Sequence, residues 1–265
     1  MGLARRIVVD VALVVLAALA LMLPVGAIEL VNAEGAARGF PAMRTLDGKS
    51  IGDGDFIQWL ERGQLHIRIT YRSTEGRIEE RAAFRQRPQL IQEAWSWREL
   101  RQGKLQRQFE VDFKSGRAVA KKHDAGKLEE WSDNVDIEPG RTFAGFGFSL
   151  AIKGLREQMV AGQRVELRAV GFTPKPKAVG VDVSFAGVER LPMAGRVVDG
   201  DHFVIHAKIP WFAEPFVDVP DTHLWLTRPP AISFLRWEGP LAEPDDPMVR
   251  VDLLPGGRSG TATPR

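Results

Sequence analysis

Apolar and polar residues alternate along most of the chain, and the stretch HFVIHAKIP shows the pattern most clearly. Phe203, Ile205 and Ala207 share one face, whereas His202 and His206 lie on the other. Successive side chains of a β-strand point to opposite faces, so the stretch is typical of a strand with one apolar face. The same alternation recurs in residues 65–71, 78–84, 105–113, 165–169, 181–185, 224–226, 234–237 and 249–253.

Short turns separate many of these runs. Gln102-Gly103 and Ser115-Gly116 each place a glycine directly after a polar residue. Glycine adopts the positive φ that tight hairpins require, so such pairs predict consecutive antiparallel neighbours. The expected fold is therefore all-β dominated: a single curved antiparallel sheet or open half-barrel with one packed amphipathic helix.

One segment has the period of a helix instead. Phe148, Ile152, Leu155 and Met159 are spaced at i, i+4, i+7 and i+11, which places them on one helical face, and Gly162 follows as a stop signal. We therefore predict a helix near residues 143–159. A single amphipathic helix between two groups of strands is expected to pack across the concave face of the sheet or to close one end of it.

The first 27 residues have the organisation of a secretory signal peptide. Arg5 and Arg6 precede an apolar run at residues 11–23, and Val25 and Ala27 supply the small residues before a cleavage site after Ala27. An uncleaved N-terminal anchor is the alternative, but the run is shorter than the roughly 20 apolar residues of a membrane span. We expect export to the periplasm of a Gram-negative-type bacterium.

The rest of the chain divides into three parts. Residues 28–63 are a lead-in segment with mixed signals, in which residues 56–60 predict one helical turn or an edge strand. Residues 64–254 form the antiparallel β-domain that contains the helix. Residues 255–265 are rich in Gly, Ser, Thr and Pro and predict a disordered tail.

Composition excludes several classes of function. With 36 Lys and Arg against 34 Asp and Glu, the chain is close to neutral, which gives no support to nucleic-acid binding. The chain contains no cysteine. Disulfides, thiolate metal sites, a cysteine nucleophile and lipid attachment at a cysteine are therefore excluded.

The order of features resembles a broad bacterial family of exported β-rich domains of unknown function. The resemblance covers residues 65–254. It rests on the hairpin from Asp112 to Leu128, the Phe-rich helix after Pro139-Gly140, and the strand LWLT before a final aromatic strand. It implies an open, strongly curved sheet that is lipocalin-like in outline. No enzyme activity or binding residue is established for the family that could be carried over to this chain, and Pro229-Pro230 departs from the pattern.

No combination of residues predicts catalysis. His202 and His206 are four residues apart on a strand, roughly 13 Å, which is too far to share one metal ion, so we expect both to face solvent. His223 could approach one of them across the sheet. Asp218, Asp221 and His223 are either an acid/base group or a turn. We expect no enzyme activity, no metal site and no cofactor.

Aromatic residues give the stronger indication of function. They either fill the core or line an apolar cleft between helix and sheet that binds a lipid-like molecule. The candidates for the cleft are Phe146, Phe148, Ile152, Trp211, Phe212, Phe216, Trp225, Phe234 and Trp237. The pair Trp211-Phe212 follows Pro210 in an aromatic loop, which is an alternative contact site for a membrane or a partner.

Three hypotheses of function follow. The first is a non-catalytic protein of the cell envelope that binds or carries an apolar small molecule or lipid in the periplasm. The second is a structural or interaction protein that meets an envelope partner through a sheet edge or the Trp211 loop. The third, with least support, is an envelope hydrolase.

Overall fold

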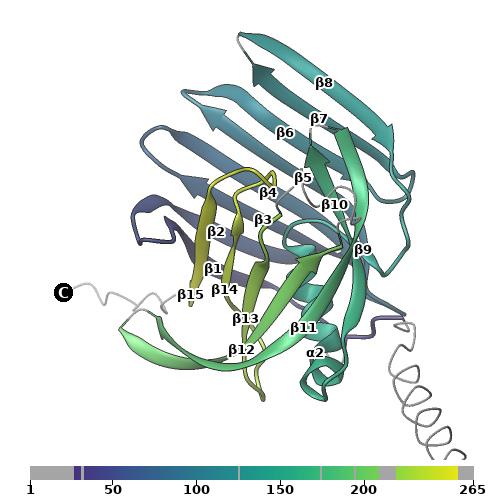
Figure 1. Ribbon diagram of the computed structural model, residues 1–265, viewed down its shortest axis with the longest axis vertical. Helices are drawn as coiled ribbons and strands as arrows, with labels where there is room; N and C mark the ends of the chain where they lie inside the picture. The colour runs from purple at the N-terminus through teal and green to yellow at the C-terminus, as the bar shows by residue number, and fades with distance from the viewer. Residues whose placement is uncertain are drawn as a thin grey trace, which may run out of the picture.

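The computed structural model describes residues 27–30, 33–124, 126–173, 175–193, 195–208 and 219–255, which form one sheet and one helix (Figure 1). The strands are β1 (Ala37–Thr45), β2 (Ser50–Glu61), β3 (Gln64–Arg72), β4 (Gly76–Arg85), β5 (Ile91–Arg101), β6 (Lys104–Asp112), β7 (Arg117–Asp124), β8 (Lys127–Asn134), β9 (Thr142–Phe143), β10 (Val165–Thr173), β11 (Lys175–Met193), β12 (Arg196–Ala207), β13 (Thr222–Thr227), β14 (Phe234–Pro240) and β15 (Met248–Pro255). The helix is α2 (Gly147–Val160).

The sheet has the strand order β8-β7-β6-β5-β4-β3-β2-β1-β15-β14-β13-β12-β11-β10-β9. The chain starts at the centre with β1, steps outward to the edge strand β8, crosses to the opposite edge and steps back to β15. The first and last strands then pair antiparallel, with Met43 opposite Val251. Every neighbouring pair is antiparallel except β9 and β10.

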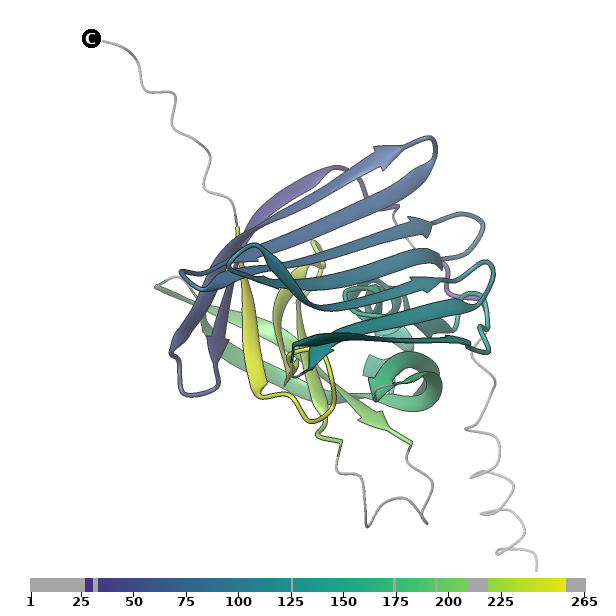
Figure 2. The same cartoon turned by 90° about the horizontal axis from the view of Figure 1, so that it is seen from above.

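Strong curvature brings distant parts of the sheet together. In Figure 2, β2–β8 form one wall and β11–β15 the other, with α2 between them at one side. Strands β7 and β8 lie close to β11, although no hydrogen-bonded ladder joins them in the described chain. The fold class predicted from the alternation, a single open curved sheet with one packed helix, is confirmed.

Helix α2 begins four residues later than the predicted start. Thr142 and Phe143 form the short strand β9 and pair with β10. Gly147 is the first helical residue, and Gly162, with a φ of +91°, follows the helix end. The predicted face is largely buried, since Ile152, Leu155 and Met159 are at most 1% exposed.

The lead-in assignment of residues 28–63 needs correction. Strands β1 and β2 occupy this segment and lie at the centre of the sheet, so residues 56–60 form neither a helical turn nor an edge strand. The alternation of apolar and polar residues is hard to recognise here, because glycines occupy positions where the close approach of a neighbouring strand leaves no room for a side chain. A β-carbon at Gly54 would collide with the carbonyl oxygen of Thr70 on β3.

Two kinds of contact hold the helix and the far strands against the sheet. A stack of aromatic rings joins β10 to β5 and β6, with the ring centroid of Phe172 4.7 Å from that of Phe109 and 6.0 Å from that of Trp95. A buried ion pair joins α2 to β12, where Arg156 Nη2 lies 2.5 Å from Asp201 Oδ2.

No helix in the described part of the chain has the length and apolar character needed to cross a membrane.

Candidate functional site

The concave face of the sheet forms a partly open cavity of about 300 Å³. Its wall comes from both halves of the sheet, from the start of α2, and from the loop of residues 241–247 between β14 and β15. Most of the wall is apolar, because the inner faces of the alternating strands meet here. Pockets of this size with few polar groups are typical of small-molecule sites.

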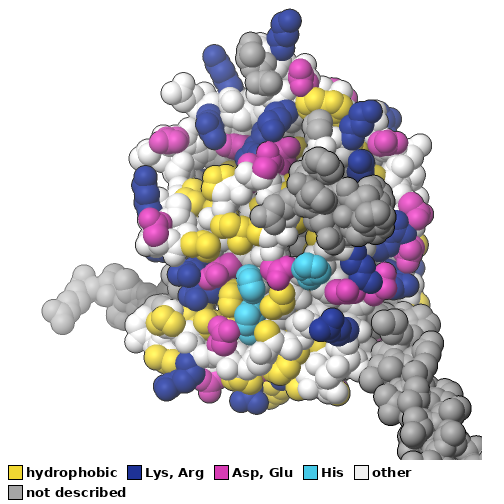
Figure 3. Space-filling view, in the orientation of Figure 1, with side chains coloured by type: hydrophobic (Ala, Val, Ile, Leu, Met, Phe, Trp, Pro, Cys, Tyr) yellow, Lys and Arg dark blue, Asp and Glu magenta, His cyan; other side chains and the backbone are white. Residues whose placement is uncertain are grey.

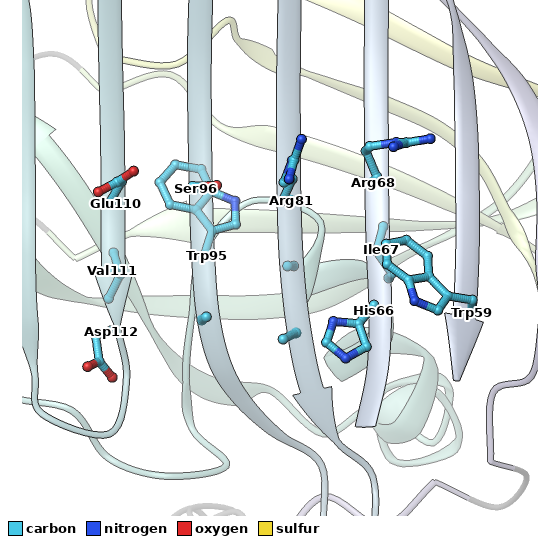
Figure 4. A pocket seen from close by; sticks show the side chains of 13 residues that line it. Trp59, His66, Ile67, Arg68, Arg81, Trp95, Ser96, Glu110, Val111 and Asp112 are labelled. Carbon is cyan, nitrogen blue, oxygen red and sulfur yellow. The ribbon is translucent and has the colours of Figure 1, made fainter. Parts of the chain in front are cut away.

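A second depression lies on the outer face of β2–β6 (Figure 4). It is open and is lined by the polar side chains of Arg68, Arg81 and Glu110, together with the stacked rings of Trp59 and His66. Along their strands these side chains alternate with buried residues such as Ile67 and Ala82, so they point to the opposite face of the sheet. We therefore interpret this depression as the solvated surface of the sheet and take the apolar cavity on the concave face as the candidate site.

The structure places four of the predicted cleft residues at the cavity wall: Phe146, Phe148, Phe234 and Trp237. Ile152 belongs to α2, is 0% exposed and packs in the hydrophobic core, so it does not line the cavity. Trp211, Phe212 and Phe216 lie outside the described residues, as does the loop that follows Pro210.

Trp225 is on the other face of the sheet. Its neighbours Leu224 and Leu226 point into the core, so the alternation of β13 directs Trp225 outward. There its ring stacks on His202 at 4.4 Å between centroids, and its Nε1 donates to Glu189 Oε2 at 3.0 Å. Trp225 therefore cannot contribute to a ligand site on the concave face.

The sequence interpretation missed several residues of the wall. Besides the four aromatics that it identified, the wall contains Phe56, Tyr71, Glu80, Trp95, Trp97 and Phe172. Of these, Glu80 had a recognisable signal. It stands between Ile78 and Ala82 in β4 at a position that the alternation assigns to the apolar face, and it lies between Ile69 on β3 and Trp97 on β5.

Glu80 connects the sheet to the start of the helix. Its Oε1 accepts hydrogen bonds from Trp95 Nε1 at 2.8 Å and from the backbone N–H of Phe146, the residue before α2, at 2.7 Å. Burial raises the pKa of the Glu80 carboxyl, although both hydrogen bonds favour its charged form. Burial also raises the pKa of Tyr71, with a smaller contribution from the charge of Glu80.

An ion cluster fixes the loop of residues 241–247 at the other side of the cavity. Arg107 on β6 is 11% exposed and contacts Glu99 at 2.8 Å, Glu243 at 3.0 Å and Asp246 at 2.8 Å. Lys122 on β7 also contacts Glu243, at 3.0 Å. The loop therefore spans from β14–β15 to the opposite wall, where Glu243 and Asp246 have basic partners.

His202, His206 and His223 lie on the outer face of β12 and β13, where histidine side chains gather in Figure 3. His202 is 9% exposed, which corrects the prediction that it faces solvent. Trp225 and Glu189 cover it, and its Nε2 lies 2.9 Å from His223 Nδ1. Burial lowers the pKa of His202. The approach of His223 across the sheet is confirmed.

His206 is exposed as predicted, and its Nδ1 lies 2.7 Å from Asp221 Oδ1. Asp221 and His223 thus have separate histidine partners on the outer face and do not converge in the cavity. Asp218 lies outside the described residues. Within the described ranges, no three His, Cys, Asp or Glu side chains are arranged to hold a metal ion.

Comparison with known proteins gives distant similarity only. No protein-family model matches the sequence, and no curated protein matches it significantly. A β-barrel-like protein of a domain of unknown function, DUF1849, from Brucella abortus aligns with a TM-score of 0.46 and 9% identity, covering 83% of this chain and 96% of the other. The hypothetical lipoprotein YmcC from Escherichia coli aligns with a TM-score of 0.31 and 10% identity, covering 83% and 84%.

Proposed function

We propose that this protein binds or carries an apolar, lipid-like ligand in its concave cavity, without catalysis. The observation that supports this most is a partly open cleft of about 300 Å³ on the concave face, lined mainly by apolar and aromatic side chains. Concave, mainly apolar sites of this kind are typical of small-molecule binding. The aromatic wall would bury a hydrocarbon chain favourably.

We also propose that the protein acts in the periplasm. The signal-peptide pattern of residues 1–27 supports export, and those residues, except Ala27, lie outside the described structure. An envelope lipid is the ligand class that such a location makes available to an apolar cavity.

The alternative role, docking of an envelope protein on a sheet edge, has one supporting observation. Strand β8 is an edge strand, and nearly all of its side chains are exposed. However, the strand has the sequence KLEEWSDN, and charged residues on an edge discourage pairing with another strand. We therefore place ligand binding first.

Mass spectrometry of small molecules that co-purify with the protein from its own envelope tests this proposal. We expect an extractable amphiphile with a long hydrocarbon chain, in an amount approaching one molecule per protein. Extraction of no apolar molecule, together with no binding of added hydrocarbon-chain probes, would lead us to the edge-docking alternative.

A further inference from the structure

The cavity wall has an unusual balance of charge. Among the described residues that line it, the ionisable acids are Glu80 and Glu243, and neither lysine nor arginine is present. Glu243 already has Arg107 and Lys122 as partners. A ligand with an anionic head would therefore be buried beside a carboxylate and without a cation, which is strongly unfavourable.

The two oxygens of the Glu80 carboxylate differ in their hydrogen bonding. Oε1 accepts both hydrogen bonds, from Trp95 and from Phe146, whereas Oε2 has no hydrogen-bond partner among the described residues. Because Glu80 lines the cavity, a head group in that space can approach its carboxylate.

The hydroxyl of Tyr71 is in a similar situation. Tyr71 also lines the cavity, and its Oη has no hydrogen-bond partner in the described chain. It lies on β3 next to β4, where Ile78 is its direct partner and Glu80 is two residues further along the same face. Glu80 and Tyr71 thus form a polar region of the cavity wall, separate from Glu243 on the loop of residues 241–247.

Local backbone geometry keeps the Glu80 carboxylate in place. Gly145 has a φ of +53°, and a β-carbon there would collide with Glu80 Oε1 and Trp95 Nε1. The loop before α2 therefore needs glycine in order to reach the carboxylate. The hydrogen bonds that hold the start of the helix use Oε1, which leaves Oε2 available to a ligand as far as the described residues show.

We propose that Glu80 determines which ligands bind: an apolar chain whose head group donates hydrogen bonds, an ammonium most strongly and a hydroxyl next, in preference to a carboxylate. This rests on the proposed binding function and adds the chemical class of the head group. An ammonium forms an ion pair as well as a hydrogen bond with the Glu80 carboxylate, whereas a hydroxyl donates a hydrogen bond but carries no opposite charge. A carboxylate head lacks a donor and has no cation to neutralise it.

Three probes with the same 18-carbon chain test the proposal: oleylamine, oleyl alcohol and oleate. Each is titrated below its aggregation concentration into the full chain, and binding is followed by the fluorescence of the tryptophans in the wall. We expect oleylamine to bind most tightly and oleate at least about tenfold more weakly, the factor that one charge-assisted hydrogen bond supplies.

Glu80→Gln separates this role from a structural one. Glutamine keeps a carbonyl oxygen for Trp95 and Phe146 but removes the charge, so oleylamine should fall to the affinity of oleyl alcohol or below it. Glu79→Gln is the matched control, because Glu79 is on the opposite face of the same strand and pairs with Arg81. It should leave the order of the three probes unchanged.

Each contrary outcome has a distinct meaning. Equal binding of the three probes to the natural chain would overturn the role of Glu80 while leaving the binding function intact. The same loss of preference in Glu79→Gln would also overturn it. Failure of every probe to bind the natural chain would contradict the binding function itself. The comparison in the natural chain stands even if Glu80→Gln does not fold.

Discussion

Replacing Arg156 by methionine is expected to lower the free energy of unfolding by about 3–5 kcal/mol, because it leaves Asp201 as a buried charge without its main partner. Asp201 is 1% exposed, and Arg156 contacts it through Nε at 2.6 Å and Nη2 at 2.5 Å. The pair joins α2 to β12, so the loss should also loosen the helix. Denaturant unfolding followed by circular dichroism measures the change.

Two further variants identify the cause. Arg156→Met combined with Asp201→Leu removes both charges and should recover most of the lost stability. Arg228→Met removes a half-exposed arginine 3.5 Å from Asp201 and should cost under about 1 kcal/mol. If the double variant is no more stable than Arg156→Met alone, the buried charge is not the source of the loss.

Ile152→Ala should cost about 2–5 kcal/mol of stability, the range for truncation of a fully buried aliphatic side chain. Ile152 is 0% exposed on the packed side of α2 and does not line the cavity. We therefore expect the loss of stability without a change in the affinity for hydrocarbon-chain probes. Unfolding and probe titration on the same protein measure both quantities.

Phe148→Ala is the matched variant from the same helix. Phe148 lies at the cavity wall and is only partly buried, so its truncation should cost less stability and should weaken probe binding. Weaker binding after Ile152→Ala together with unchanged binding after Phe148→Ala would mean that the ligand lies elsewhere.

The alternation of apolar and polar residues was sufficient to predict most of the strands and the single curved sheet. It failed in β1 and β2, where glycines replace side chains at close strand contacts. The pairing of β1 with β15 could not be predicted, because those strands are separated by nearly the whole chain and no local pattern specifies it. The curvature that brings β10 against β5 and β6 is likewise a property of the assembled sheet.

The candidate site was predicted in part, and the errors have physical causes. Trp225 was grouped with Phe234 and Trp237 because they are close in sequence, although its parity in β13 directs it to the outer face. Phe234 and Trp237 are three residues apart, a spacing that would place them on opposite faces of a regular strand. They share a face because β14 is irregular at Leu235, where its register with β13 shifts. Trp95 and Trp97 were not among the predicted cleft residues, because the wall that they form depends on the curvature of the assembled sheet.

The central claim is that the concave cavity holds an apolar ligand, and Gly171 gives a direct way to test it. Gly171 lines the cavity, and a β-carbon there would meet no atom within 4 Å. Gly171→Leu should therefore occupy ligand space without disturbing its neighbours. Gly35→Leu is the control, since Gly35 is exposed and also has no atom within 4 Å of its β-carbon position.

The deciding measurement is quenching of tryptophan fluorescence by a brominated stearyl alcohol, since bromine quenches on contact and Trp95, Trp97 and Trp237 line the cavity. Saturable quenching in the natural chain and in Gly35→Leu, with affinity reduced about tenfold or more in Gly171→Leu, is the result we predict. Equal quenching in all three proteins, or none in the natural chain, would contradict ligand binding in this cavity.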